Sequence, residues 1–122
     1  MQPQKDSAPS STRFVVGNRR KPRFKIEVDI TVHSRTQGVL TGHTVDISES
    51  GIAALLRIEA PLGELVELEF TLPFGPVGIY AIARQRNAFR YGFQFAESEA
   101  IHRSIRETCS HLEIERALLG YP

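Results

Sequence analysis

The segment FKIEVDITVH, from Phe24 to His33, has the most regular pattern in the chain. Apolar and polar residues alternate over all ten of its positions. Successive side chains of a β-strand point to opposite faces of the sheet, so a period of two predicts one strand with a buried face and a solvated face. The residues predicted to face the core are Phe24, Ile26, Val28, Ile30 and Val32.

Five further strands are predicted downstream of this segment. Turn sequences rich in Gly, Pro and Ser separate them, including RTQG after the first strand and PFGPVG before the fifth. Short strands at near-regular spacing, with no helix between them, predict an antiparallel barrel or sandwich. A closed barrel is favoured because it leaves no exposed sheet edge. The predicted strands cover residues 39–47, 52–58, 64–72, 79–86 and 90–96.

The C-terminal region changes to a helical period, which predicts a helix over about residues 98–119. Ser98 is the predicted N-cap, and Gly120 supplies the stop. We interpret this helix as one that plugs or flanks the barrel. The alternative is an interaction helix, because three of its apolar residues lie seven positions apart. The apolar residues at helical spacing are Ile101, Ile105, Cys109, Leu112 and Leu119.

The length and composition fit one globular domain. The chain has 122 residues, of which 41% are apolar and 24% charged, as is ordinary for a soluble protein. No run approaches the roughly 20 apolar residues of a membrane span, and the first residues contain no apolar segment of signal-peptide type. The single Cys109 excludes an internal disulfide framework. Together these features predict a cytoplasmic protein.

The net charge of +1 hides an uneven distribution. Residues 1–25 carry seven cations and one anion, whereas residues 26–122 carry eight cations and thirteen anions. We therefore expect a basic arm on a mildly acidic body. The segment GNRRKPRF, Gly17–Phe24, holds four of the cations just before the first strand. Arginine suits phosphate oxygens and the O6/N7 edge of guanine, although a solvated tail would also explain such a cluster.

A second polar segment, TVDISESGIA, lies where the second predicted strand ends and the third begins. Asp46 and Ser48 are typical turn residues and Gly51 suits a positive φ, so a tight turn explains them without a ligand. The alternative is a binding role, since a carboxylate and a hydroxyl at a barrel rim can accept hydrogen bonds from the N1–H and amino group of a purine.

Taken together, these two segments resemble the PilZ domain family. Arg19 and Arg23 form an Arg-x-x-x-Arg motif before the first strand, and DISESG supplies Asp-x-Ser-x-x-Gly. The segment YGFQF, Tyr91–Phe95, is similar to the family's late Gly-x-x-Phe strand. The resemblance covers roughly residues 18–118.

The fold implied by the resemblance is all-β with a C-terminal helix, a six-stranded antiparallel PilZ-type β-barrel. The implied domain covers residues 18–120, with the barrel at about 24–96 and the helix at about 98–119. Residues 1–17 then form a disordered N-terminal arm.

The implied function is that of a non-catalytic receptor for the bacterial second messenger cyclic di-GMP (c-di-GMP), with no cofactor and no metal. The arginines would hold phosphate and guanine, the carboxylate and hydroxyl would contact a guanine base, and the glycine would keep the turn open. Arg84 lies near a position where family members often place a further ligand-facing side chain, and Asn18 occupies a position linked to binding one or two nucleotides. The residues to which the resemblance assigns c-di-GMP binding through the two motifs are Arg19, Arg20, Arg23, Asp46, Ser48 and Gly51.

The presumed mechanism is ordering of the basic arm over the ligand, in which charge-assisted hydrogen bonds offset the lost conformational entropy. Such a switch would signal to a downstream protein partner that the sequence does not name. Monomer and homodimer both fit the sequence.

Three other classes of function were weighed. Catalysis would require His43, Asp46 and Ser48 to act together, but no Gly-x-Ser-x-Gly elbow is present, and the four His residues lack metal-ligand spacing. A nucleic-acid-binding barrel would display aromatic residues for base stacking, whereas most strand aromatics here fall on the predicted core faces. A PilZ-fold interaction module that does not use nucleotide stays open.

Overall fold

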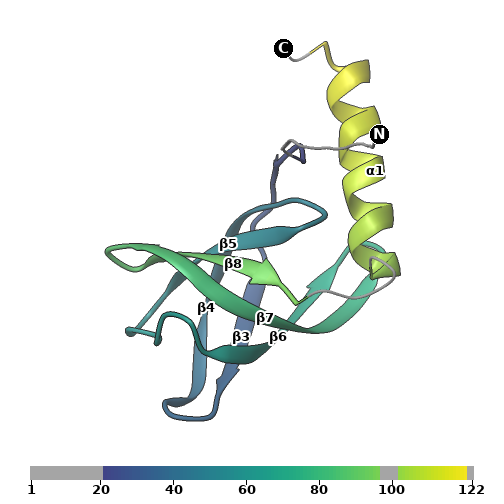
Figure 1. The fold of residues 1–122 in the computed structure, drawn as a ribbon. Helices are drawn as coiled ribbons and strands as arrows, with labels where there is room; N and C mark the ends of the chain where they lie inside the picture. Colours follow the sequence, from purple (N-terminus) through teal and green to yellow (C-terminus); the bar gives the residue numbers. More distant parts are fainter. Residues whose placement is uncertain (1–20, 97–101, 121–122) are drawn as a thin grey trace, which may run out of the picture.

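The computed structural model describes residues 21–96 and 102–120 (Figure 1). The predictions for the arm at 1–17, for Asn18, Arg19 and Arg20, and for Ser98 as N-cap lie outside these residues. The described elements are β2 (Phe24–Lys25), β3 (Asp29–Ser34), β4 (Gly38–Ile47), β5 (Gly51–Leu56), β6 (Leu65–Leu72), β7 (Gly75–Asn87), β8 (Arg90–Phe95) and α1 (Arg103–Leu118).

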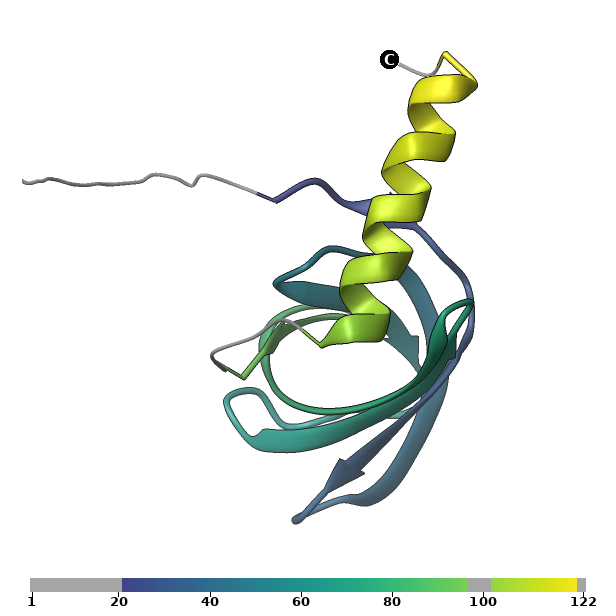
Figure 2. The ribbon, with the colours of Figure 1, turned by 90° about the vertical axis from the view of Figure 1, so that its right-hand side faces the viewer.

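The strands β3 to β8 form a closed antiparallel barrel. Neighbouring strands pair in the order β4-β3-β6-β7-β8-β5, and β5 pairs again with β4 to close the ring. The short β2 pairs with the last residues of β4 and extends the barrel wall at that end. Figure 2, turned by 90° from Figure 1, shows the strands as a ring with α1 beside it. The predicted six-stranded antiparallel barrel with a C-terminal helix is confirmed.

The barrel interior is filled by side chains that alternate inward along the strands. The five residues predicted to face the core do so, three of them buried and two partly buried. Tyr91 is fully buried, and its hydroxyl accepts a hydrogen bond of 2.9 Å from the backbone N–H of Ala60. The core therefore holds a large aromatic residue without leaving its polar atom unsatisfied.

The first predicted strand is interrupted, which corrects the prediction of one continuous strand over Phe24–His33. Lys25 in β2 lies opposite Asp46, and Asp29 in β3 lies opposite His43. These two pairs are thus four positions apart along β2 and β3 but only three positions apart along β4. Such an extra residue is typical of a β-bulge, which bends a strand and increases its twist. Beyond this interruption, β2 pairs with the last residues of β4.

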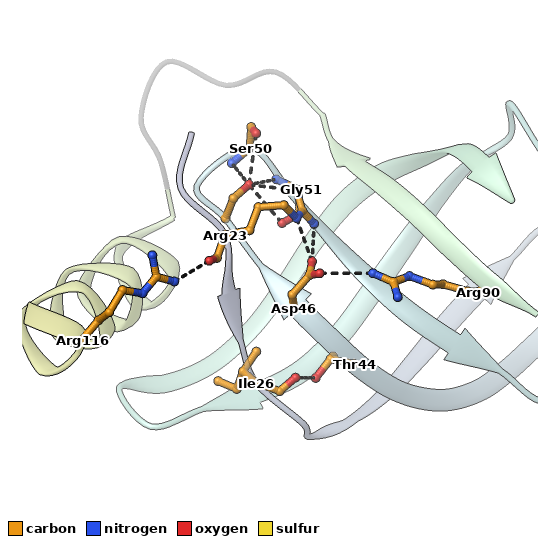
Figure 3. Close-up of polar contacts among 9 residues, drawn as sticks. Arg23, Ile26, Thr44, Asp46, Ser50, Gly51, Arg90 and Arg116 are labelled. Atoms are coloured by element: carbon orange, nitrogen blue, oxygen red, sulfur yellow. Dashed lines mark hydrogen bonds and ion pairs between the residues drawn. The ribbon is translucent and has the colours of Figure 1, made fainter. Parts of the chain in front are cut away.

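Thr44 of β4 satisfies the backbone at this interruption (Figure 3). Its hydroxyl donates to the carbonyl oxygen of Ile26 at 2.6 Å, as Figure 3 shows. The same hydroxyl accepts from the backbone N–H of Val28 at 2.9 Å. Thr44 is buried, so its hydroxyl acts as both donor and acceptor where water has little access.

The PFGPVG loop is shorter than predicted, because β7 begins inside it. Leu72 lies opposite Gly75, so two residues suffice for the turn. Gly75 has a φ of +131°, which favours glycine. Pro76 fits into β7 because this part of the strand pairs with β6 only, and pairing with β8 begins at Ala81.

The helix α1 begins at Arg103, later than the predicted start near residue 98. Its N-cap is His102, whose ring Nδ1 accepts from the backbone N–H of Ser104 at 3.2 Å. Histidine is not among the usual N-cap residues, which explains why the start was misplaced. Gly120 has a φ of +73°, as expected for a residue that ends a helix. Within the described residues, no helix is long and apolar enough to cross a membrane.

The two halves of α1 differ in their surroundings. The first half packs against the barrel, and the helix contacts β2, β6 and β7, so the prediction of a flanking helix is confirmed. The second half projects beyond the barrel (Figures 1 and 2). The buried residues are Ser104, Ile105, Thr108 and Cys109, and the exposed apolar ones are Ile114, Leu118 and Leu119.

Candidate ligand-binding site

Arg23 and Asp46 meet at the barrel rim. The antiparallel pairing of β2 with β4 sets Phe24 opposite Ile47 and Lys25 opposite Asp46, which brings the residue before β2 next to that carboxylate. Nε and Nη2 of Arg23 lie 2.8 and 2.6 Å from Oδ1 of Asp46 (Figure 3). The two sequence segments singled out above are therefore joined by an ion pair.

Asp46 has a second cationic partner, Arg90. Nη2 of Arg90 lies 3.3 Å from Oδ2 of Asp46, so both carboxylate oxygens are occupied (Figure 3). The Asp46 side chain is only 17% exposed, whereas those of Arg23 and Arg90 are 46% and 51% exposed. The carboxylate is thus a fixed anchor between two cations that reach into solvent.

Ser48 organises the turn between β4 and β5. Its Oγ accepts hydrogen bonds from the backbone N–H groups of Ser50 and Gly51, both at 3.2 Å. Nη1 of Arg23 lies 3.5 Å from the same oxygen. Because Ser48 is 0% exposed, its observed role is to hold the turn, and its contact with a base stays a prediction.

Gly51 is required for a different reason from the one predicted. It does not have a positive φ. Instead, a Cβ atom at this position would collide with the carbonyl oxygen of Phe93 on β8. The glycine therefore permits a close approach of β5 and β8, which corrects the expectation of a special turn conformation.

A groove of about 1090 Å³ opens beside the Arg23–Asp46 pair on the outer wall of the barrel. Small residues from β5 and β8 line it; Ala53 lies opposite Gly92, and Gly51 is two residues before Ala53. These three residues carry no side chain larger than a methyl group, and the longer side chains of Gln85 and Gln94 line the groove beside them. The cations that line the groove are Lys21, Arg23, Arg84, Arg86 and Arg90.

Three of these cations come from β7 and β8. Arg84, a predicted site residue, donates through Nε to Oε1 of Gln94 at 2.8 Å. Arg86 pairs with Glu59 at the edge of the groove. Arg86 and Arg90 are not among the residues predicted from the sequence. The available signal is the run ARQRNAFR, whose hairpin turn brings cations from two strands to one surface.

The structure does not bring the candidate catalytic residues together. Nδ1 of His43 lies 3.2 Å from Oδ1 of Asp29, while Asp46 pairs with arginines and Ser48 is buried in its turn. Within the described residues, no cluster of His, Cys, Asp and Glu could hold a metal ion. Burial raises the pKa of the Cys109 thiol to about 11, so this thiol is protonated at neutral pH.

The sequence matches the PilZ domain family over residues 17–109. The chain belongs to the PilZ domain family. This confirms the resemblance inferred from the two motifs. The match ends at Cys109, the last buried residue of α1, so the second half of the helix lies beyond the PilZ match. A comparison with curated proteins found no match.

Solved structures with a similar fold include PilZ proteins. The PilZ domain of YcgR from Escherichia coli with c-di-GMP has 18% identity and a TM-score of 0.66, covering 86% of this chain and 99% of that chain. YcgR from Escherichia coli in complex with c-di-GMP has 21% identity and a TM-score of 0.68, covering 85% and 50%. The Bacillus subtilis inhibitor of motility, MotI/DgrA, has 18% identity and a TM-score of 0.66, covering 88% and 55%. The PilZ domain thus spans about half of the two longer chains.

Proposed function

We propose that this PilZ domain is a non-catalytic receptor for c-di-GMP. The observation that carries the proposal is the Arg23–Asp46–Arg90 cluster at the edge of a basic groove. Two structures of similar fold, both from Escherichia coli, contain c-di-GMP. Both PilZ motifs are complete in this chain.

The chemistry of the cluster fits the two kinds of group in the ligand. c-di-GMP carries two anionic phosphodiesters and two guanines. Arg23 and Arg90 would bind phosphate oxygens or the O6/N7 edge of guanine, and Asp46 would accept from the guanine N1–H and amino group. Without ligand these groups satisfy one another. Because the arginines are half-exposed, groups of a ligand could replace them at the carboxylate.

The wall of the groove suits a planar base. Gly51, Ala53 and Gly92 present backbone and a single methyl group, so a guanine ring would lie close to the strands. Arginine guanidinium groups stack well on such rings. We assign Ser48 a positioning role here, since its hydroxyl fixes the turn that follows Asp46.

The remaining arginines of the motif complete the proposed site. Arg19 and Arg20 precede Arg23 by four and three residues, a reach of up to about 14 Å in extended chain. They would close over the bound nucleotide. The ordered arm would then change the surface presented to a partner protein, which is how a non-catalytic domain transmits a signal.

Isothermal titration calorimetry with c-di-GMP, GTP and a short RNA tests this proposal. We expect binding of c-di-GMP alone, lost in Arg23→Ala. Arg35→Ala is the matched control: it removes the same charge at the β3–β4 turn, at the other end of β4 from Asp46. No heat from c-di-GMP with the wild-type protein would refute the receptor function.

A nucleotide-independent interaction module is the second candidate. The exposed apolar residues in the second half of α1 and at its C-cap, Ile114, Leu118 and Leu119, favour it. An absence of binding heat from all three ligands in the same titration would support this candidate. Binding of RNA alone would support a nucleic-acid-binding barrel instead.

A further inference from the structure

Arg116, in the last turn of α1, contacts the chain on both sides of the Arg23–Phe24 peptide bond, and Figure 3 shows its contact with Arg23. Its Nη2 donates a hydrogen bond of 2.6 Å to the carbonyl oxygen of Arg23. Its guanidinium carbon lies 4.3 Å from the ring centroid of Phe24. A charged hydrogen bond and a cation–π contact thus act on consecutive residues.

These contacts restrain the backbone from which the Arg23 side chain extends. Phe24 is anchored in the core, and Arg116 fixes the peptide unit between it and Arg23. The position of that unit determines where the Arg23 guanidinium can reach, and therefore whether it meets Asp46 and the groove. Restraint of a binding residue before the ligand arrives raises affinity, because less freedom is lost on binding.

The same contact holds the second half of α1. The buried residues of the helix end at Cys109, and Leu112 is partly buried beyond them. Arg116 adds a hydrogen bond to Arg23 and a cation–π contact with Phe24 in the last turn of the helix. Arg116 also lies outside the segment that matches the PilZ family, residues 17–109. The barrel fold by itself therefore does not explain this contact.

We propose that Arg116 is a positioning residue of the ligand site, which clamps the Arg23 segment and couples it to the second half of α1. This inference rests on the proposed function. If c-di-GMP favours one position of the Arg23 segment, the clamp transmits that preference to the helix. By thermodynamic linkage, the coupling is reciprocal: if the ligand stabilises one position of the helix end by a given factor, fixing the helix end in that position raises ligand affinity by the same factor.

The experiment combines calorimetry with hydrogen exchange on the full chain, with and without c-di-GMP. The variants are Arg116→Ala, Arg116→Lys and Arg106→Ala. Arg106→Ala is the matched control because it removes the same charge from an exposed position of the same helix. Exchange is measured in residues 21–28, around the clamp, and in residues 112–119, at the end of the helix.

We expect Arg116→Ala to bind c-di-GMP about tenfold more weakly than Arg106→Ala, as loss of a charged hydrogen bond implies. Arg116→Lys keeps a donor but loses the planar stacking group, so its affinity should be intermediate. Ligand should slow exchange in residues 112–119 of the wild type and of Arg106→Ala, and leave it unchanged in Arg116→Ala. A purely structural role for Arg116 would not remove this ligand-dependent change.

Equal affinities of Arg116→Ala and Arg106→Ala would overturn the inference while leaving the receptor function intact. Absence of binding by the wild type would overturn the receptor function and the ligand-site part of the inference with it. In that case, hydrogen exchange measured without ligand tests whether Arg116 restrains the Arg23 segment. Faster exchange of residues 21–28 in Arg116→Ala than in Arg106→Ala supports it, and equal rates exclude it.

Discussion

Two carboxylates, Asp46 and Glu64, organise the regions at opposite ends of β4, and they do so in different ways. Ten residues of β4 separate these regions by about 30 Å. Glu64 accepts hydrogen bonds from four neutral donors at the end of β3 and in the β3–β4 turn, two of them backbone N–H groups and two of them short hydroxyl side chains. The donors are the hydroxyl of Ser34 (2.8 Å), the N–H of Arg35 (3.1 Å), and the N–H and hydroxyl of Thr36 (both 3.2 Å).

Asp46, by contrast, is held by the ends of two long cationic side chains, Arg23 and Arg90. These long side chains can leave the carboxylate for another partner without moving a strand, whereas the two backbone N–H donors to Glu64 cannot leave without moving the turn. The comparison teaches that a satisfied carboxylate can serve two purposes. Glu64 stabilises a turn, whereas Asp46 holds cationic side chains that the proposed ligand would displace.

The largest expected effect is a difference in c-di-GMP affinity between variants of the two carboxylates. Asp46→Asn removes the acceptor charge, so we expect c-di-GMP affinity to fall about 100-fold through the lost charge-assisted hydrogen bonds. Glu64→Gln, the matched change at the other end of β4, should leave affinity unchanged. Calorimetric titration of both variants measures the difference. Equal losses in the two variants would break the comparison.

A smaller effect is expected at the second partner of Asp46. Arg90→Ala should weaken binding by about tenfold, because one cation of the groove is lost while Arg23 keeps the carboxylate in place. The melting temperature should barely change, since an exposed ion pair contributes little stability. An affinity equal to that of Arg35→Ala would remove Arg90 from the site.

The smallest expected effect concerns the stability of the Glu64 turn. The hydroxyl of Ser34, followed by the N–H and hydroxyl of Thr36 and the N–H of Arg35, lowers the pKa of Glu64 below its ordinary 4.5 against a smaller opposing effect of desolvation. A carboxyl with a lowered folded-state pKa stabilises the fold above its unfolded-state pKa, and this contribution is lost as the pH falls through the folded-state value.

Glu64→Gln should therefore melt at a lower temperature than the wild type at neutral pH, by a few degrees. The gap should narrow as the pH falls below about 4.5. Melting curves followed by circular dichroism across this range give the result. A gap that is constant down to acidic pH would show that the ionised carboxylate does not stabilise this turn.

Local sequence patterns predicted the strands well because alternation is a property of neighbouring residues. Five inward-facing residues were assigned from period two alone, and their burial agrees. The interruption between β2 and β3 could not be predicted in this way, since it depends on the register with β4 and on the hydroxyl of Thr44. The helix start was misplaced because an unusual residue, His102, provides the cap.

The candidate site was predictable only in part, for a related reason. Arg23 and Asp46 were found through spacing that resembles a known family, and the pairing of β2 with β4 joins them. Arg90 lies 44 residues from Asp46 in the chain, and no local pattern connects the two. Arg116 lies 93 residues from Arg23 in the chain, so the contact between them could be found only in the folded structure.

The buried thiol of Cys109 makes the protein convenient to label. Maleimide reagents are attacked by the thiolate form of cysteine, and a thiol with a pKa of about 11 supplies almost no thiolate at neutral pH. A cysteine introduced as Leu118→Cys would sit at a position that is 81% exposed and would react selectively. A fluorophore attached there would report on the end of α1 in real time, with the natural cysteine left in place.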